Sequence, residues 1–318
     1  MSGGPVLSRA LGLGLGYAAD RVLGDPARWH PVAGFGRLAG RVEQVAYADR
    51  RAAGAVHVAL LVGGAVGLGA VAERAVHGRP AGHVLLTAAA TWTVLGGTSL
   101  DRETAAVERL LAAGSLEAAR RQVARLVGRD TTSLDAGGVA RAAVESVAEN
   151  TSDAVVAPLV WGAVAGVPGL LGHRAANTLD AMVGHRSTRY ARFGWAAARL
   201  DDVLNLPGSR LTAALVVVLG EDRRGAVRAW RRDAAAHPSP NAGPVESSVA
   251  GALGVRLGGT TAYGTGADRR VEERPALGDG REPDHVDLAR ARRLVLRVDL
   301  AAVLVAAAVA GGGSHRSP

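Results

Sequence analysis

The sequence of 318 residues contains no cysteine and no lysine, so all 37 residues counted as lysine or arginine are arginine. The absence of cysteine excludes thiolate nucleophiles, thiolate metal sites, iron–sulfur clusters and disulfides. The absence of lysine excludes a Schiff-base lysine and the P-loop, because the lysine of that loop reaches the phosphates. Any phosphate chemistry must therefore rely on arginine, backbone N–H groups or a metal ion.

Aromatic residues are also scarce, at 3% of the chain, whereas 48% of the residues are hydrophobic. The formal net charge of +8 could indicate nucleic acid, but the sequence shows no basic patch interleaved with stacking aromatics. An arginine excess in loops beside apolar spans more often sets membrane orientation. We therefore expect a membrane protein with no nucleic-acid partner.

Several apolar stretches approach the length of about 20 residues that crosses a bilayer. Two of them, 55–72 and 81–100, are separated by a short loop and predict a helical hairpin, and 294–310 is a third candidate. The stretches 5–19 and 211–220 are weaker, and the last is long enough only if residues from Leu204 onward contribute. The sequence thus predicts an all-α, polytopic protein with about four to five membrane segments.

The apolar stretch 155–172 is long enough to span but contains Pro158 and Pro168 together with Gly162, Gly166 and Gly169. This composition favours a broken or re-entrant helix that lines a cavity. Polar motifs precede and follow the stretch. If it crosses the membrane fully, the two polar groups face opposite compartments, and if it re-enters, they converge. We favour convergence.

The remaining segments carry weaker signals. Residues 115–127 have the pattern of an amphipathic surface helix with Ser115 at its N-cap. Residues 260–284 are rich in Gly, Arg, Asp, Glu and Pro, which predicts a solvated loop, and no strand is predicted anywhere. We expect residues 1–310 to form a single helical membrane domain, with polar loops at 101–154, 174–210 and 221–293, and residues 311–318 to be a disordered tail.

The densest polar pattern consists of Arg141, Glu145, Glu149 and Asp153, which are spaced four apart. A helix aligns such residues as one stripe. The stripe is either a solvated helix face or a site, and we favour a site because it is mostly acidic and runs into an apolar segment. Carboxylates in this number suit Mg²⁺, which keeps waters and bridges substrate phosphates.

Two shorter motifs each allow a plain and a functional interpretation. Asp25 and His30 belong either to a turn that His30 caps or to a site for a cation or phosphoryl group. Arg129 and Asp130 form either a surface ion pair or a pair of ligands, in which Arg129 meets an anion and Asp130 a metal.

Further polar residues recur along the second half of the chain. Asn177 and Asp180 share one helical face, and Asp201 and Asn205 share another. The loop 237–243 contains two prolines, which fix a non-helical conformation, and rigid polar loops often present ligand contacts. At this density of polar residues we predict a binding or catalytic site.

Taken in order, these motifs resemble the adenosylcobinamide-phosphate synthase family of cobalamin biosynthesis. The resemblance extends from about Asp20 to Gly259. The matching segments are Gly24–Pro26 with His30–Val32, Gly128–Thr131, Arg141–Pro158, Asn177–Gly184, Phe193–Asn205, Ser239–Gly243 and Ala250–Gly254. The sequence departs from the family pattern at His185, at Leu206–Ser209 and at Pro244–Glu246.

The resemblance implies a multi-pass inner-membrane enzyme whose polar loops face the cytoplasm. The family joins aminopropanol or its phosphate to the free propionate of adenosylcobyric acid in an ATP-dependent amide bond, so the resemblance implies a ligase that uses ATP and Mg²⁺. It also implies a corrinoid substrate and, as partners, other cobalamin-biosynthesis enzymes. Two alternatives remain open: a transporter using intramembrane carboxylates, and a membrane scaffold for cobalamin enzymes.

The motifs and the resemblance together assign expected roles to individual residues. Phosphorylation of the carboxylate by ATP would activate it for attack by the amine. The expected catalytic residues are Glu145, Glu149, Asp180, Asp201 and His30, of which the last three would orient or deprotonate the amine. The expected metal ligands are Asp130, Glu145, Glu149 and Asp153. The expected substrate or phosphate ligands are Arg129, Arg141, Asn150, Asn177, Arg199, Asn205 and Asn241.

Overall fold

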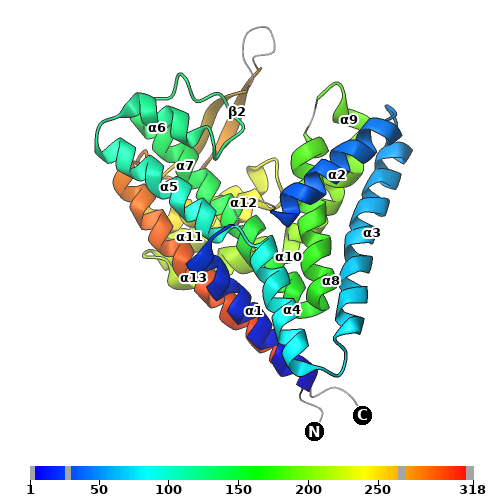
Figure 1. The fold of residues 1–318 in the computed structure, drawn as a ribbon. Helices are drawn as coiled ribbons and strands as arrows, with labels where there is room; N and C mark the ends of the chain where they lie inside the picture. The colour runs from blue at the N-terminus through cyan, green and yellow to red at the C-terminus, as the bar shows by residue number, and fades with distance from the viewer. Residues whose placement is uncertain (1–3, 26–29, 186, 264–269, 313–318) are drawn as a thin grey trace. The chain divides into compact units, whose positions relative to one another are not determined.

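A computed structural model of the chain describes residues 4–25, 30–185, 187–263 and 270–312 (Figure 1). Helices dominate these residues, with a single pair of short strands, as the sequence predicts. The chain divides into two compact units that alternate along the sequence, a distinction that the expected single domain did not make. Unit 1 comprises residues 1–96, 153–208 and 302–318, and unit 2 comprises residues 97–152 and 209–301.

Unit 1 is built mainly from long apolar helices. In it α1 (Gly4–Leu23) packs along α4 (Pro80–Val94), and α3 (Arg51–Ala75) packs along α8 (Ala157–Leu179). The shorter α2 (Pro31–Ala46) contacts both α3 and α8. Pro31 occupies the first turn of α2, where its missing N–H costs no helical hydrogen bond.

The core of unit 1 depends on a close crossing between α3 and the one-turn helix α9 (Tyr190–Phe193). Phe193 is fully buried between Leu61, Leu179 and other apolar side chains. A Cβ atom at Gly54 of α3 would overlap the carbonyl oxygen of Phe193. Glycine is therefore required at position 54 for this packing.

The helix α8 is broken, as the composition of residues 155–172 predicts. Gly166 has a φ of 65°, and Pro168 follows inside the helix. The carboxylate Oε1 of Glu73, near the end of α3, accepts a hydrogen bond of 2.9 Å from the Val167 N–H. Because the break leaves this N–H without a helical acceptor, Glu73 acts as a cap for the second half of α8.

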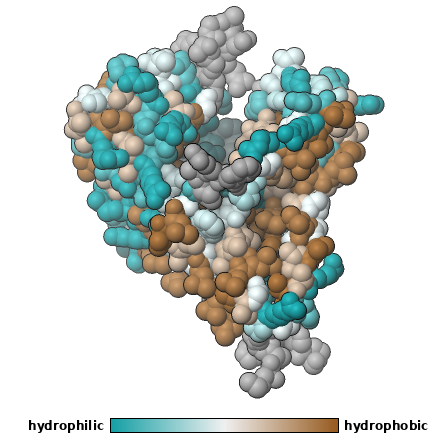
Figure 2. Space-filling model, in the orientation of Figure 1, coloured by the Kyte–Doolittle hydropathy of each residue, from teal (hydrophilic) through white to brown (hydrophobic). Residues whose placement is uncertain are grey.

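Within the described residues, four helical stretches are long and apolar enough to cross a membrane, in agreement with the four to five segments predicted. They are Arg51–Ala75, Ala136–Gly184, Trp195–Leu219 and His285–Gly312. The weak candidate 211–220 lies in α10 (Trp195–Leu219), so the residues that precede it do contribute. Figure 2 shows apolar side chains gathered over α3, where Val56, Leu60 and Leu68 are exposed. These exposed apolar side chains fit contact with lipid.

The predicted second arm of the hairpin, 81–100, is wrong in its length. Helix α4 ends at Val94, because Leu95 is extended, and a new helix, α5, begins at Gly97. The Gly96 N–H donates instead to the carbonyl of Ala154. Helix α4 also packs mainly along α1 rather than α3. The sequence runs apolar through this break, so hydropathy alone could not place it.

Unit 2 contains shorter helices and the only strands of the described residues. Helices α5 (Gly97–Ala112) and α6 (Leu116–Val123) pack beside α7 (Ala136–Thr151), and α11 (Arg223–Asp233) packs against α12 (Ala242–Leu253). The expected polar loops are therefore largely helical. The amphipathic helix predicted at 115–127 is present but ends at Val123, and the Ser115 side chain makes no capping hydrogen bond.

The solvated loop predicted at 260–284 is corrected to a β-hairpin. Strand β1 (Leu257–Tyr263) pairs antiparallel with β2 (Arg270–Leu277). The register shifts between Leu257 and Gly259, where Gly258 and Gly259 have φ values of 82° and 88°. Because glycine is depleted in strands and usually marks a bulge, Gly258 and Gly259 prevented strand β1 from being predicted from the sequence.

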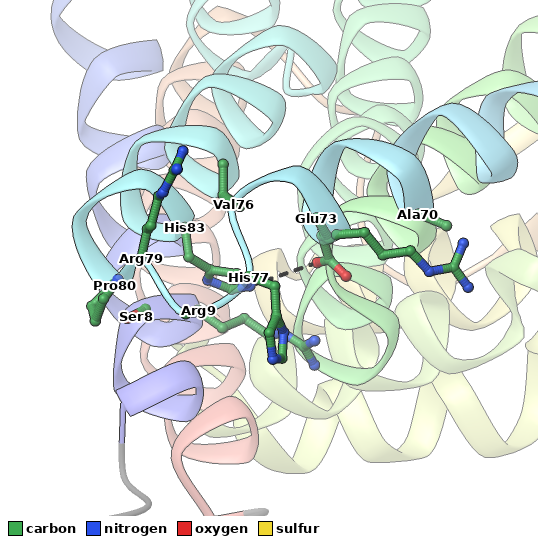
Figure 3. Close-up of a pocket in the computed structure, with 11 residues that line it drawn as sticks. Ser8, Arg9, Ala70, Glu73, Val76, His77, Arg79, Pro80 and His83 are labelled. Atoms are coloured by element: carbon green, nitrogen blue, oxygen red, sulfur yellow. Dashed lines mark ion pairs between the residues drawn. The ribbon is translucent and has the colours of Figure 1, made fainter.

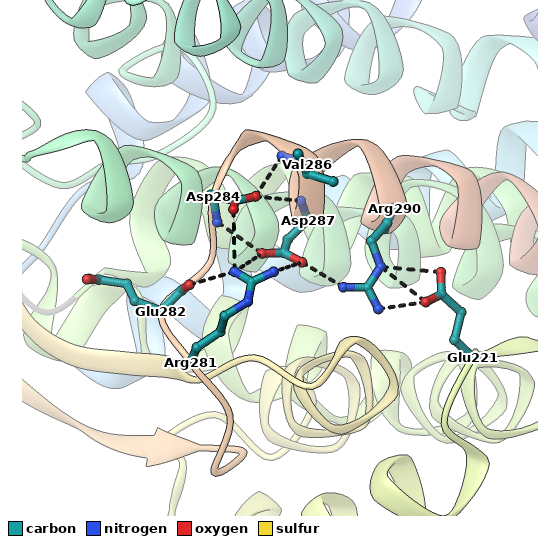
Figure 4. A network of polar contacts seen from close by, with 7 residues as sticks. All are labelled: Glu221, Arg281, Glu282, Asp284, Val286, Asp287 and Arg290. Atoms are coloured by element: carbon teal, nitrogen blue, oxygen red, sulfur yellow. Dashed lines mark hydrogen bonds and ion pairs between the residues drawn. The ribbon is translucent and has the colours of Figure 1, made fainter.

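Helix α13 (His285–Gly312) begins in a network of charges (Figure 4). The Asp287 carboxylate is fully buried and accepts hydrogen bonds of 2.7 Å from both Arg281 and Arg290. Arg290 also binds Glu221, which anchors the start of α13 within unit 2. At the other end, α13 continues to Gly312, so the first two residues of the expected tail are helical. Residues 313–318 of that tail lie outside the described residues.

We expect Gly54→Ala to lower the free energy of unfolding by about 1–3 kcal/mol, because the new methyl group would push α3 away from α9. Unfolding in detergent, followed by tryptophan fluorescence, measures the change. Gly67→Ala is the matched control on the same helix, since a Cβ there meets no atom within 4 Å. That control should leave stability unchanged or raise it by up to ~1 kcal/mol through helix propensity. Equal effects of the two substitutions would contradict the close crossing.

Candidate functional site

A buried ion pair lies at the centre of unit 2. The Arg129 guanidinium, in the loop before α7, approaches Glu145 Oε2 of α7 to 2.5 Å. The other carboxylate oxygen, Oε1, accepts a hydrogen bond of 2.8 Å from the Gly258 N–H of β1. The two side chains are only 9% and 2% exposed. The predicted functional residues Arg129 and Glu145 are thus brought together, and the plain interpretation of Arg129–Asp130 as a surface ion pair is wrong.

Two further carboxylates lie close to this pair. Glu149 follows Glu145 by one turn of α7 and interacts electrostatically with Glu145, Arg129 and Arg274. Glu246 of α12 is 1% exposed. Burial, followed by the negative charges of Glu145 and Glu149, raises the pKa of Glu246 well above its ordinary value. The neutral form of the Glu246 carboxyl group is therefore favoured.

His237 faces Glu246 from the loop before α12. The Ser239 N–H donates to His237 Nδ1 at 3.0 Å, so Nδ1 is an acceptor and the proton of the neutral ring resides on Nε2. Burial lowers the pKa of His237, which keeps the ring neutral. His237 Nε2 lies 3.9 Å from Glu246 Oε1, and neither atom has a hydrogen-bond partner among the described residues.

Such a buried, unsatisfied pair is unusual, because leaving a polar group without a partner costs about 1–3 kcal/mol. A ligand oxygen placed beside both atoms would accept from His237 and from the protonated Glu246. We call Arg129, Glu145, Glu149, His237, Glu246 and Arg274 together the unit 2 cluster. This arrangement can bind and stabilise an oxygen anion in an environment shielded from water.

The predicted helical stripe is present for three of its four members. Arg141, Glu145 and Glu149 lie on α7 at successive turns, and Arg141 reaches Glu282 at 3.4 Å. Asp153 lies beyond α7 in a π-helical turn at Ser152–Val156 and belongs to unit 1. A π turn holds more residues than an α turn and so ends the spacing of four on which the stripe depends.

The four expected metal ligands are not gathered into one group. Asp130 accepts hydrogen bonds from the N–H and hydroxyl of Thr132, and Glu145 is engaged by Arg129 and Gly258. Across residues 4–25, 30–185, 187–263 and 270–312, no three His, Asp or Glu side chains converge closely enough to hold a metal ion. The structure therefore offers no preassembled carboxylate cage in these regions.

A second group of polar residues is buried in unit 1. Asn177 donates to Asp201 at 3.3 Å, which joins two residues that the sequence places on separate helical faces. Asn205 Oδ1 accepts a hydrogen bond from His173 Nε2 at 2.8 Å, and both side chains are buried. Asp180 interacts electrostatically with Asp201. The predicted residues of segments 177–180 and 201–205 are thus assembled in one place.

Arg174 extends this unit 1 group. Its guanidinium lies 3.4 Å from Asn177 Oδ1 and interacts electrostatically with Asp25 and Asp153. Asp153, which was expected to bind a metal ion, therefore interacts with the positive charge of Arg174. Within unit 1 the group can orient a polar substrate, but it has no preformed metal site.

The other predicted site residues make local contacts. His30 Nδ1 accepts from the Val32 N–H and caps α2 rather than the predicted turn, of which Pro26 lies outside the described residues, while its Nε2 lies 4.0 Å from Asp25. Arg199 approaches Asp202 at 3.8 Å on an exposed face. Asn150 donates to the carbonyl of Ser146. Asn241 accepts from Ser209 and Arg210, which holds the proline-rich loop against the middle of α10.

Five residues of these groups were not predicted individually as site residues: Glu246, His237, Arg274, His173 and Arg174, although the loop that carries His237 was expected to present ligand contacts. Glu246 carried a usable signal, because it is the only charged residue between Asn241 and Gly254. His173 and Arg174 carried another, since they interrupt an apolar run one helical turn before Asn177. Arg274 stands among other charges of its strand and could not have been singled out.

Comparison with known proteins gives one consistent family. The CobD/Cbib protein family model matches residues 13–295. A protein of Mycobacterium tuberculosis named cobalamin biosynthesis protein CobD is 56% identical over 94% of this chain and 95% of its own length. The protein of that name from Chromobacterium violaceum is 44% identical over 97% of this chain and 100% of its own. No solved structure matches the chain significantly.

Removing one member of the buried ion pair should be costly. We expect Arg129→Ala to lower the free energy of unfolding by about 3–5 kcal/mol, because it leaves the Glu145 charge buried without its cation. The matched control is Arg125→Ala, whose ion pair with Glu103 is 65% exposed on the arginine side and should contribute less than about 1 kcal/mol. Denaturant unfolding in detergent measures both, and a similar small loss for the two variants would refute the central role of the pair.

The raised pKa of Glu246 predicts how stability changes with pH. The folded state keeps the proton of Glu246 at pH values where the unfolded chain has lost it. The stabilising effect is therefore complete below the ordinary pKa of 4.5 and is lost as the pH rises toward the folded pKa. Within this window wild type should lose up to ~1.4 kcal/mol per pH unit relative to Glu246→Gln. Parallel stability–pH curves for the two proteins would contradict a protonated Glu246.

Proposed function

Because the chain belongs to the CobD/Cbib family of cobalamin biosynthesis proteins, we propose that it forms an amide bond on a corrinoid substrate. The proposed reaction joins the free propionate of adenosylcobyric acid to (R)-1-amino-2-propanol or its phosphate and consumes ATP. The product is adenosylcobinamide or its phosphate. The observation that best supports this proposal is the unit 2 cluster. In it, the buried Arg129 and the carboxyl group of Glu246 in its neutral form would bind an oxygen anion.

The reaction requires activation, because a carboxylate is a poor acyl donor. In the proposed first step a propionate oxygen attacks the γ-phosphorus of ATP, which releases ADP and leaves an acyl phosphate. In the second step the amine attacks the acyl carbon, the C–O bond to phosphate breaks, and the amine loses a proton. The products of the two steps are the amide, ADP and inorganic phosphate.

The residues of unit 2 suit the phosphoryl part of this chemistry. Arg129 and Arg141 are the cations that would offset developing charge on phosphoryl oxygens, in a chain that has no lysine. A protonated Glu246 would donate a hydrogen bond to an anionic oxygen, and His237 Nε2–H would donate a second. Neutral donors of this kind stabilise an anion without adding another buried charge.

Magnesium fits this site as a companion of ATP rather than as a resident ion. Mg²⁺ usually keeps several waters and binds through one or two carboxylates and the substrate phosphates, so a preassembled cage is not needed. Glu149 is the carboxylate that would hold it, because Glu145 is already engaged by Arg129 and Gly258. The ion would offset the charge of the triphosphate when MgATP is bound.

The polar residues buried in unit 1 would bind the amine substrate. Asp201, placed by Asn177 and accompanied by Asp180, would orient the ammonium group or accept its proton. His30 stays a further candidate, although its Nδ1 already caps α2. We propose that both groups act from the cytoplasmic side of the inner membrane, where other enzymes of cobalamin biosynthesis would supply the corrinoid.

A transporter is the second candidate, and one observation favours it. The broken helix α8 carries His173, Arg174 and Asn177 on its second half, and broken helices with polar residues line substrate paths in transporters. A transporter would move a substrate in proteoliposomes without forming a covalent bond.

A scaffold for other enzymes would keep its function when the charges of Glu145 and Glu149 are neutralised.

The direct test uses detergent-purified protein with adenosylcobyric acid, aminopropanol phosphate, ATP and Mg²⁺, followed by mass spectrometry. We expect an ATP-dependent amide product from wild type and at least a 100-fold lower rate from Glu149→Ala, which is on the order of the loss of a metal-binding group. Glu117→Ala is the control in the same unit, because Glu117 is 73% exposed on α6. Wild-type turnover by a folded Glu149→Ala variant would rule out this assignment of Glu149.

A further inference from the structure

A pocket of about 410 Å³ lies in unit 1 at the turn between α3 and α4, apart from the groups already described. Its walls come from the first turns of α1, the last turn of α3 and the start of α4, as Figure 3 shows. Gly78, with a φ of 73°, allows the tight turn that joins the two helices. The pocket therefore sits at the very end of a membrane-spanning helix.

The pocket contains one carboxylate, Glu73, and the contacts of its Oε1 are with the protein itself. Glu73 Oε1 accepts from the Val167 N–H at 2.9 Å and lies 3.9 Å from His83 Nε2. Arg9, which also lines the pocket, donates to the Ala163 carbonyl at 3.4 Å. A guanidinium has five N–H donors, so this single contact leaves Arg9 with further donors for a ligand.

The balance of charge around the pocket is positive. Arg9, Arg74 and Arg79 contribute three positive charges and Glu73 one negative charge, which leaves a formal charge of +2 with His77 and His83 neutral. His77 and Arg79 are exposed at the rim. In Figure 3 the His77 ring lies beside the Arg9 side chain. Clustered arginines are the usual protein partners of phosphate groups.

The surroundings of the pocket are those of a lipid boundary. Helix α3, a candidate membrane span, ends at Ala75, directly at the pocket. Leu68 and Val71 of α3, Leu85 of α4 and Leu7 of α1 are exposed apolar residues close to it in the chain, each at least 62% exposed. Apolar faces that end in arginines match the change from acyl chain to headgroup.

We propose that this pocket binds the phosphate headgroup of an anionic phospholipid. The phosphate lies beside Arg9 and His77, Arg79 adds positive charge at the rim, and the acyl chains follow the exposed apolar faces of α3 and α4. The bound lipid would rest against Glu73 and hence against the cap of the broken helix α8. The proposal concerns lipid alone and holds whether or not the chain forms an amide bond.

The test compares lipid retention by the full chain after reconstitution into nanodiscs of phosphatidylglycerol or of phosphatidylcholine. Native mass spectrometry of the released protein counts the bound lipids. We expect wild type to retain phosphatidylglycerol in preference to phosphatidylcholine. The His77→Gln/Arg79→Gln double variant should lose about tenfold in that retention, because one interfacial arginine and a second polar contact are removed.

This double variant alters only exposed rim residues, so its thermal unfolding should match that of wild type. Arg9→Gln, tested separately, probes the arginine beside the phosphate, and Arg41→Gln on the exposed face of α2 is the control that should retain lipid normally. Equal retention of the two lipids, or unchanged retention by both pocket variants, would overturn the proposal. Soluble glycerol 3-phosphate that binds lipid-free protein as tightly as phosphatidylglycerol would overturn the lipid assignment in favour of a soluble phosphate.

Discussion

The buried pair of Arg129 and Glu145 is the interaction on which the arrangement of unit 2 depends. An ion pair removed from water is stable only when its remaining hydrogen-bonding capacity is also satisfied. Glu145 meets this condition by accepting from Gly258 with its second oxygen, so one carboxylate ties together a loop, a helix and a strand. Ser146, the next residue of α7, binds the Leu126 carbonyl and reinforces the same connection.

Burial first, and then the charges around the pair, bias the ionisation of Glu246. Arg129 is committed to Glu145, and the negative charges of Glu145 and Glu149 make a third charge at the buried Glu246 unfavourable. The neutral form of Glu246 is therefore favoured, and in that form the carboxyl group is a hydrogen-bond donor. A chain without lysine gains in this way a set of anion-binding groups made from arginine, a neutral carboxyl group and a neutral histidine.

In unit 1, too, one carboxylate satisfies a buried hydrogen-bonding group from another element. The break in α8 at Gly166 and Pro168 leaves the Val167 N–H without a helical acceptor, and Glu73 supplies one from another helix. The second half of α8 then begins at a defined place and presents Arg174 and Asn177 to the polar residues around them. In both units a single carboxylate fixes the elements that carry the candidate ligands.

The sequence by itself determined what depends on composition, on helical spacing and on the order of motifs. The presence of apolar helices at α3, α10 and α13, the break in α8 and the alignment of Arg141, Glu145 and Glu149 follow from apolar runs, from Gly and Pro, and from the helical period. The ordered motifs also indicated the family that the comparisons then showed. All of these features are local, or can be recognised one segment at a time.

Only the tertiary structure decided which distant residues meet. Glu246 and His237 join the Glu145 cluster from another helix and loop, and no local period relates them to α7. Asp153 leaves the stripe because a π turn intervenes, α4 ends early because Gly96 donates to Ala154, and glycines conceal the strand β1. These outcomes depend on contacts between segments far apart in the chain, and contacts of that kind leave no pattern in a single sequence.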